Sequence, residues 1–263
     1  MKDLQIMRPE IAFFDIDGTL LDFGADRIRP TVVNALQKLQ GGGCKLFLAT
    51  GRAPFMVPAF QEISFDGVLC FNGSLCFDRK GIIFSNPLDQ ADLLTLINNA
   101  EQMGKPVILA TERMRGYTFY DHCLDDYLQL AKIKCEQIDL QRMETDPVYQ
   151  LTIPATGEYD TQLLQGTTQL KTARWWDKVV DVIPAHGGKA LAMEHILLHY
   201  GIEKENSLAF GDGDNDLDMI RFAGVGIAMG NASNAVKEAA DWVTNSCAED
   251  GVYTALVALG LIE

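Results

Sequence analysis

Residues 11–18 read Ile-Ala-Phe-Phe-Asp-Ile-Asp-Gly, four apolar residues followed by two aspartates on alternate positions and a glycine. A short apolar run that stops at turn residues is typical of a strand buried on both faces of a parallel sheet. The carboxylates of Asp15 and Asp17 then follow the carboxyl end of this strand, which is where open α/β sheets bind ligands. This stretch therefore predicts the class of fold and the position of a site.

The segments on either side of a long central stretch alternate between strand and helix patterns. Further buried strands are predicted by short apolar runs at residues 46–49, 68–71, 208–210 and 225–229. Helices are predicted over residues 30–40, which begin with proline and are followed by three glycines, and over residues 189–200, which are followed by Gly201. This alternation predicts an α/β fold with a Rossmann-like, doubly wound parallel sheet as its core.

The central stretch, residues 85–183, has a different order of helix and strand patterns. A helical pattern comes first, over residues 90–103. Alternating strand patterns follow at residues 106–110, 115–120 and 149–153. They predict an α+β cap domain over residues 85–183, inserted into a discontinuous core domain of residues 1–84 and 184–263. A length of 263 residues is sufficient for two such domains.

Composition and charge limit the classes of partner. The chain has 48% hydrophobic and 22% charged residues, as an ordinary globular protein does, and a formal net charge of −14. This charge gives no general attraction for nucleic acid or for an anionic membrane, so neither is expected as a partner. A phosphorylated substrate would need local positive charge, which favours a metal ion at the site.

The amino-terminal residues and the cysteines favour a cytoplasmic protein. Residues 1–10 contain no apolar run typical of a signal peptide, and no stretch of the chain approaches the 18 or more apolar residues of a membrane span. The six cysteines include no Cys-x-x-Cys pair, so neither a zinc site nor a disulfide framework is predicted. Reduced thiols are expected instead.

Polar groups of complementary kinds follow three of the predicted strands. The first strand is followed by Asp15 and Asp17, the second by Thr50, and the strand at residues 208–210 by an acidic stretch at residues 212–216. Each piece alone has an ordinary structural explanation, such as a turn or a helix cap. Together at one sheet edge, however, the carboxylates would repel one another unless a cation lay between them. Hard oxygen ligands in this number predict a Mg²⁺ site.

These stretches resemble, in order, the four motifs of the haloacid dehalogenase superfamily. The motifs are Phe-Asp-Ile-Asp-Gly-Thr-Leu at residues 14–20, Ala-Thr-Gly-Arg at residues 49–52, Lys189, and Phe-Gly-Asp-Gly-Asp-Asn-Asp at residues 210–216. Residues 72–73, 228–232 and 239–241 are further similar to the Cof-type branch, in which an α/β cap of the C2B type lies between the second and third motifs. The resemblance implies a phosphatase, and the predicted insert has the size and place of that cap.

The resemblance also implies a role for each matching residue. Asp15 would be the nucleophile that forms an aspartyl-phosphate, and Asp17 would be the general acid and base. Asp15, Asp17 and Asp212 would hold Mg²⁺, Asp17 through its backbone carbonyl, with Asp216 next to the ligands. The residues that would hold phosphate oxygens are Thr50, Gly51, Arg52, Lys189 and Asn215.

The expected activity is Mg²⁺-dependent hydrolysis of phosphate monoesters of small metabolites, and the resemblance favours sugar phosphates because related capped enzymes commonly take them. Two alternatives stay open. A phosphomutase or phosphotransferase would use the same nucleophile and differ only in the acceptor. A phosphorylatable signalling receiver would share the acidic cluster, but it would be much shorter and would need no acid at Asp17. In the cap, Trp175 and Trp176 are predicted either to pack in its core or to stack on a sugar ring.

Overall fold

The computed structural model describes residues 8–22, 24–130, 135–138 and 146–263. Contacts group the chain into two compact units. The core unit consists of Met1–Gly51, Pro58–Phe84 and Gly188–Glu263, and the cap unit consists of Arg52–Val57 and Ser85–Gly187. The domain limits expected from the sequence, after residues 84 and 183, stay a prediction.

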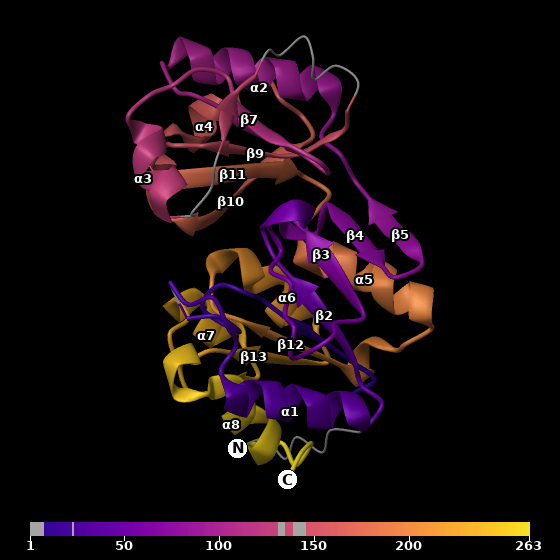
Figure 1. Ribbon diagram of the computed structural model, residues 1–263. Helices are drawn as coiled ribbons and strands as arrows, with labels where there is room; N and C mark the ends of the chain where they lie inside the picture. Colours follow the sequence, from indigo (N-terminus) through magenta and orange to yellow (C-terminus); the bar gives the residue numbers. More distant parts are fainter. Residues whose placement is uncertain (1–7, 23, 131–134, 139–145) are drawn as a thin grey trace. The chain divides into compact units, whose positions relative to one another are not determined.

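The core unit is built on one sheet of eight strands in the order β14-β13-β12-β1-β2-β3-β4-β5 (Figure 1). Its strands are β1 (Ile11–Phe14), β2 (Lys45–Ala49), β3 (Gly67–Cys70), β4 (Leu75–Asp78), β5 (Gly81–Ser85), β12 (Ser207–Gly211), β13 (Val225–Ala228) and β14 (Trp242–Val243). The strands from β14 to β3 run parallel, and β4 is antiparallel to β3. The predicted α/β fold with a parallel sheet is therefore confirmed.

The register of the central strands brings their carboxyl ends to one edge of the sheet. Phe14 of β1 lies opposite Phe210 of β12 and Leu48 of β2. All four residues of β1 are fully buried, and the rings of Phe14 and Phe210 stack with their centroids 4.9 Å apart. Burial of each phenyl ring contributes about 1.5–3 kcal/mol, so apolar packing holds the strands that lead to Asp15 and Asp212.

Helices complete the core unit. Within the described residues these are α1 (Pro30–Gly41), α5 (Lys189–Tyr200), α6 (Leu217–Phe222), α7 (Asn234–Ala239) and α8 (Gly251–Ala258). Residues of α5 and α6 share an apolar cluster with Phe13 and Phe47 of the sheet, and α1 contacts α8 (Figure 1). Gly201 ends α5 in a left-handed conformation with φ of 65°, which glycine adopts without strain. The helix predicted over residues 189–200 is confirmed, and Lys189 is its first residue.

The cap unit contains a second, mostly antiparallel sheet in the order β10-β11-β9-β6-β7-β8. Its strands are β6 (Ile108–Thr111), β7 (Arg115–Tyr117), β8 (Glu136–Gln137), β9 (Val148–Ile153), β10 (Leu170–Trp176) and β11 (Val179–Pro184). The helices α2 (Gln90–Gln102) and α4 (Asp160–Leu163) share an apolar cluster with Leu109 and Val180. The helix α3 (Cys123–Leu130) packs with Ile108 and Val179, which precede Leu109 and Val180 in their strands. Because adjacent strand residues point to opposite faces, the helices cover both sides of this sheet.

Some strands of the structure differ from the sequence-based expectation. The strands β4 and β5 extend the core sheet beyond β3. They were not predicted, because β3, β4 and β5 follow one another without an α-helix between them, which breaks the strand–helix alternation. The strand predicted over residues 115–120 ends at Tyr117. The Thr118 backbone N–H still donates to the Val107 carbonyl at 2.9 Å, but the Val107 N–H donates to the Thr118 hydroxyl at 3.1 Å, so a side chain replaces one of the two backbone bonds there.

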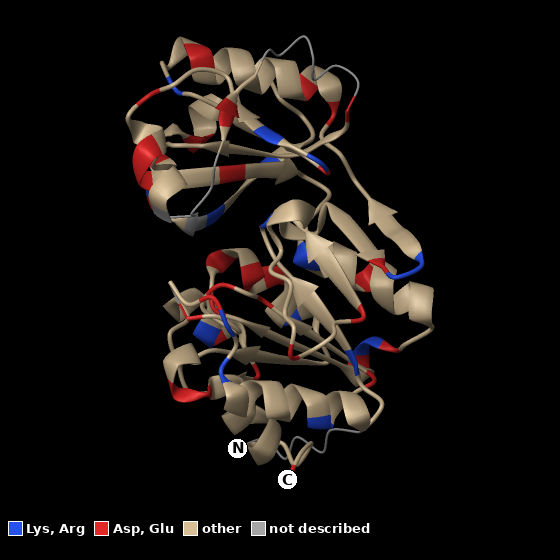
Figure 2. Cartoon of the chain, viewed as in Figure 1, with Lys and Arg blue, Asp and Glu red and all other residues tan. Residues whose placement is uncertain are grey.

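Acidic residues are spread over both units, as Figure 2 shows. This distribution agrees with 36 Asp and Glu residues against 22 Lys and Arg residues in the whole chain. Within the described ranges, no helix has the length and apolar character needed to cross a bilayer.

Candidate active site

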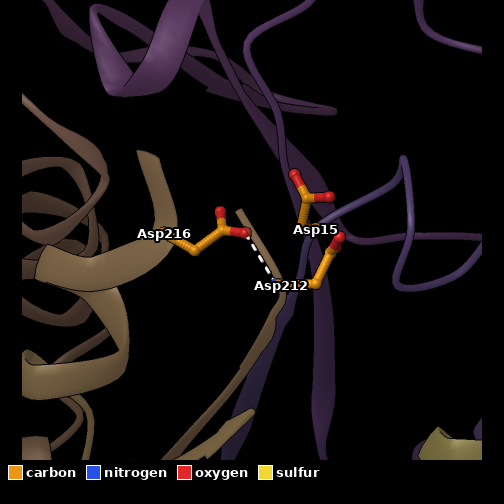
Figure 3. Close-up of side chains that lie close together, drawn as sticks. All are labelled: Asp15, Asp212 and Asp216. Atoms are coloured by element: carbon orange, nitrogen blue, oxygen red, sulfur yellow. Dashed lines mark hydrogen bonds between the residues drawn. The ribbon is translucent and has the colours of Figure 1, made fainter. Parts of the chain in front are cut away.

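The carboxyl edge of the core sheet gathers three buried carboxylates. Asp15 follows β1, Asp212 follows β12, and Asp216 ends the short 3-10 turn Asp214–Asp216. These side chains are 6%, 8% and 1% exposed, and one oxygen from each lies within 4.8 Å of the others (Figure 3). The sequence predicted Asp15 and Asp212 as neighbours, and the structure brings them together with Asp216.

Lys189 lies among these carboxylates. It is fully buried at the start of α5, and its Nζ donates hydrogen bonds to Asp15 Oδ1 at 2.7 Å, to the Ala49 carbonyl at 2.8 Å and to Asp216 Oδ1. An ammonium group has three N–H donors, so the protein uses all of them. Lys189 therefore orients the Asp15 carboxylate and connects it to β2 and to Asp216.

Asp216 also orders the loop that carries Asp212. Its Oδ2 accepts a hydrogen bond from the backbone N–H of Asp212 at 2.9 Å (Figure 3) and another from the backbone N–H of Gly213 at 3.0 Å. Gly211 permits this close approach, because a Cβ at that position would lie 2.6 Å from the Asp216 Cβ. Both oxygens of Asp216 are thus engaged by protein donors.

Burial and crowding raise the pKa values of two carboxylates. Burial, and then the charge of Asp216, hold the pKa of Asp15 well above its usual range, although Lys189 opposes this effect. The same two causes raise the pKa of Asp212 to about 7. Burial alone would lower the pKa of Lys189, but Asp15 and Asp216 outweigh burial and raise it. One lysine does not balance three carboxylates, so the cluster favours a further cation.

A glycine brings the loop after β1 against Asp212. Gly18 has a φ of 92°, and a Cβ there would lie 2.2 Å from Asp212 Oδ2. The next residue, Thr19, donates its hydroxyl to Asp212 Oδ1 at 2.8 Å. Asp17 lies in the same loop, and unlike Asp15 it is exposed. The two aspartates of the first motif therefore have different surroundings, which suits them to different roles.

A second group of polar residues lies at the end of β2. Thr50 is 1% exposed, and its carbonyl accepts a hydrogen bond from the Asn72 amide at 3.0 Å. The Asn72 side chain lies against Gly51, where a Cβ would be 3.1 Å from Asn72 Oδ1, and this same oxygen accepts a hydrogen bond from Asn215 Nδ2 at 3.0 Å. The structure thus brings Thr50, Gly51 and Asn215 together around Asn72, and their part in phosphate binding stays a prediction.

Asn72 was not predicted as a site residue, although residues 72–73 carry part of the resemblance to the Cof-type branch. Asn72 adopts a left-handed conformation, with φ of 53° and ψ of 35°, which asparagine tolerates better than most residues. This conformation turns the chain directly after β3. A buried asparagine at such a turn is the signal that could have identified it.

Arg52 is the remaining residue predicted to bind phosphate. It belongs to the cap unit, where its Nη1 donates a hydrogen bond to the Met56 carbonyl at 3.1 Å. Its part in phosphate binding stays a prediction.

The fold and the site together define a class of protein. A parallel α/β core that presents a buried aspartate, a lysine and further acids at the carboxyl edge of its sheet is that of a hydrolase with an acidic centre whose carboxylates could hold a cation. The chain belongs to the haloacid dehalogenase-like hydrolases, because the sequence profile of this family matches residues 12–256.

Individual relatives extend over almost the whole chain. YkrA of Bacillus subtilis (strain 168), whose name as a phosphatase is provisional, is 32% identical over 98% of this chain and 100% of its own length. The 5-amino-6-(5-phospho-D-ribitylamino)uracil phosphatase YitU of the same organism is 28% identical over 93% of this chain and 95% of its own. The solved structure of the subclass IIB sugar phosphatase BT4131 has a TM-score of 0.88 at 30% identity, and covers 96% of this chain and 100% of that one. These findings confirm the predicted superfamily and identify a Cof-type phosphatase.

Proposed function

We propose that the chain hydrolyses phosphate monoesters of small metabolites through an aspartyl-phosphate on Asp15, with Mg²⁺ at the acidic cluster. The observation that carries this proposal is the environment of Asp15. Its buried carboxylate accepts a hydrogen bond from Lys189 at 2.7 Å and lies beside Asp212 and Asp216. A nucleophile held in one orientation, next to a positive charge and a potential metal site, is suited to attack phosphorus.

The residues of the cluster fit Mg²⁺. This ion takes oxygen ligands and is usually held by one or two carboxylates together with water and substrate phosphate. Asp216 already has both oxygens engaged by Lys189 and by backbone N–H groups, so Asp15 and Asp212 are the proposed carboxylate ligands, with the Asp17 carbonyl as a third. When bound, Mg²⁺ would neutralise charge on the phosphate and on the attacking carboxylate.

The reaction would proceed in two displacements at phosphorus. In the first, an oxygen of Asp15 attacks phosphorus, the bond to the ester oxygen breaks, and Asp17 gives its proton to that leaving oxygen. In the second, Asp17 removes a proton from water, the water oxygen attacks phosphorus, and the acyl-phosphate bond breaks. Inorganic phosphate and the Asp15 carboxylate result. The exposed position of Asp17 suits a group that exchanges protons with a leaving group and with water.

The proposed phosphate site consists of groups already brought together by the fold. Thr50, Gly51 and Asn215 lie around Asn72. Before substrate binds, Lys189 holds the Asp15 carboxylate, and its three N–H donors are occupied by protein acceptors. As the Asp15 oxygen bonds to phosphorus it loses its charge, and Lys189 is then able to donate to a phosphate oxygen.

Metal dependence is the first expected result. Excess EDTA should abolish phosphate release from a panel of phosphorylated metabolites, and Mg²⁺ should restore it, because the carboxylates need a cation to bind a phosphate dianion. Ca²⁺ should support little activity, since its coordination is larger and looser. Phosphate and the dephosphorylated product are measured together, because a shortfall of phosphate would indicate transfer to a second acceptor. Full activity after dialysis against EDTA would contradict the proposed metal site.

The substrate class is proposed from the relatives and the cap unit. BT4131 is named as a sugar phosphatase and YitU as the phosphatase of a phospho-D-ribityl compound, so polyhydroxylated leaving groups are favoured. Trp176 packs against the apolar cluster that includes Leu124 and Tyr127, which supports a packing role. The side chain of Trp175 lies outside what the structure describes. Another residue of the cap unit is therefore the better candidate for distinguishing between substrates.

Arg115 of β7 is that candidate. It is 8% exposed, and its Nη1 donates to the Tyr127 hydroxyl at a long distance of 3.3 Å. Among the residues that the structure describes, its buried Nε has no hydrogen-bond partner, and the same holds for the Nε of Arg174. The two arginines differ in their other nitrogens, because those of Arg174 donate to Asp160 and to backbone carbonyls within the cap unit. An unused donor on a buried cation is costly, which supports a role in binding an acceptor on the leaving group.

Arg115→Met should change the ranking of substrates while hardly affecting p-nitrophenyl phosphate. We expect kcat/KM for the best metabolite to fall by about 10- to 100-fold, the effect of one hydrogen bond from a charged donor. Arg174→Met is the matched control, because Arg174 pairs with Asp160 at 2.5 Å within the cap unit. The control should lower the melting temperature without changing the ranking. An equal fall in kcat/KM for all substrates of Arg115→Met, including p-nitrophenyl phosphate, would contradict a role of Arg115 in distinguishing between substrates.

A further inference from the structure

Asn231 connects three segments of the core unit that are far apart in the sequence. It follows β13 and is an exposed residue, yet both the nitrogen and the oxygen of its side-chain amide have protein partners. Its Nδ2 donates to the Gly18 carbonyl at 2.9 Å and to Asp212 Oδ2 at 3.2 Å, while its Oδ1 accepts from the Cys247 amide at 2.9 Å. An exposed asparagine needs none of these bonds, because water would serve it equally well. Their convergence therefore indicates a specific role.

The first consequence concerns the Asp212 carboxylate. Its Oδ2 accepts from Asn231, and its Oδ1 accepts from the Thr19 hydroxyl at 2.8 Å. Two donors on opposite oxygens restrict rotation of the carboxylate. Both donors are neutral, so they orient the carboxylate without cancelling its charge. Each oxygen keeps a further lone pair with which to bind a cation.

The second consequence concerns the loop that carries Asp17. Asn231 holds the carbonyl of Gly18, the residue that follows Asp17. Gly18 also donates its amide to the Leu21 carbonyl at 2.7 Å, so its peptide group is fixed from both sides. Together with the Thr19 hydroxyl, the Asn231 side chain thus holds the loop after β1 against Asp212.

We infer that Asn231 is a positioning residue for the divalent cation. It holds Asp212 and the Asp17–Gly18 segment in the arrangement that receives the ion, so the ion does not have to order them on binding. This inference rests on the proposed function for the identity of the ion, Mg²⁺. Partners that orient metal ligands typically contribute 10- to 100-fold in affinity, so we expect a loss of about that size when the asparagine is removed.

The test measures Mg²⁺ binding directly, through the rise in melting temperature of the full chain as Mg²⁺ is added to metal-free protein. Asn231→Ala should weaken the apparent Kd for Mg²⁺ by about 10- to 100-fold. At saturating Mg²⁺, kcat should fall by much less than the affinity for Mg²⁺ does, because the bound ion then holds Asp212 and the Asp17–Gly18 segment itself. Asn206→Ala is the matched control, since Asn206 donates to Glu10 at the opposite end of β12 and should leave the Kd unchanged.

The outcomes separate this inference from the proposed function. If Asn231→Ala lowers the melting temperature of the metal-free protein but binds Mg²⁺ like the wild type, Asn231 only joins loops and the inference is wrong. If Asn231→Ala does not fold, Asn231→Ser retains a hydroxyl at this exposed position and should show the same weakening. Unchanged affinity in Asn231→Ser would equally overturn the inference. A wild type that shows neither a Mg²⁺-dependent shift nor Mg²⁺-dependent activity would refute the metal in the proposed function, and with it the role of Asn231.

Discussion

Asp15→Asn should be inactive at every Mg²⁺ concentration. The carboxamide keeps the size of the side chain and one oxygen, but it is too weak a nucleophile to form the acyl-phosphate. We expect a loss of about 10⁶-fold in kcat, the scale of removing a covalent nucleophile. Steady-state phosphate release over a wide range of Mg²⁺ concentrations measures this effect. A fold control is needed, because the substitution also changes the partner of the buried Lys189.

Asp212→Asn is the matched variant for this comparison, with the same change of atoms at a neighbouring position. Asp212 is proposed to bind the ion and to form no covalent bond. The substitution should raise the Mg²⁺ concentration for half-maximal activity by about 100-fold or more, since even partners of metal ligands contribute 10- to 100-fold. High Mg²⁺ should therefore restore part of the activity. Equal rescue of both variants would contradict the separate roles of Asp15 and Asp212.

Asp17→Asn should affect the two displacements differently when p-nitrophenyl phosphate is the substrate. For a sugar phosphate, turnover should fall by about 10²- to 10⁴-fold, because the alkoxide leaving group lacks its acid. The p-nitrophenolate ion leaves without a proton, so the first displacement should survive with p-nitrophenyl phosphate. The second displacement still needs a base for water and should be slow.

The expected observation with p-nitrophenyl phosphate is a burst of nitrophenol, followed by slow release. Stopped-flow absorbance records the amplitude, which should not exceed about one equivalent per active site. The wild type, measured in parallel, should show no such accumulation if its second displacement is fast. A burst in Asp15→Asn and none in Asp17→Asn would mean that the nucleophile and the acid have been assigned the wrong way round.

The strands that lead to the site could be predicted from the sequence, because each is a short apolar run followed directly by polar residues. Asp15 and Asp212 are placed by these strands, and parallel pairing brings their ends together without any further information. The different surroundings of Asp15 and Asp17 could not be predicted in the same way. The chain has left the strand at Asp15, so the alternation of strand faces no longer tells which carboxylate is buried.

Contacts between distant segments account for most of what the sequence did not predict. Lys189 stands at a helix start, where lysines are usually solvated, and only the convergence of Asp15, Ala49 and Asp216 explains its burial. Asn231 reaches Gly18 across 213 positions of the chain. No local pattern of residue types encodes such a pair. The roles of Lys189 and Asp216 were suggested by resemblance, whereas the contacts of Asn231 became visible only in the folded chain.

The central claim is that Asp15 carries the phosphoryl group, and peptide mapping of acid-quenched enzyme tests it most directly. Asp17→Asn is mixed with p-nitrophenyl phosphate and Mg²⁺, quenched during the burst, digested and analysed by tandem mass spectrometry. We predict one added phosphoryl group per chain, on Asp15, and none in a parallel sample that carries Asp15→Asn as well. A phosphoryl group on any other residue, or a burst of nitrophenol with no covalent adduct, would contradict the account.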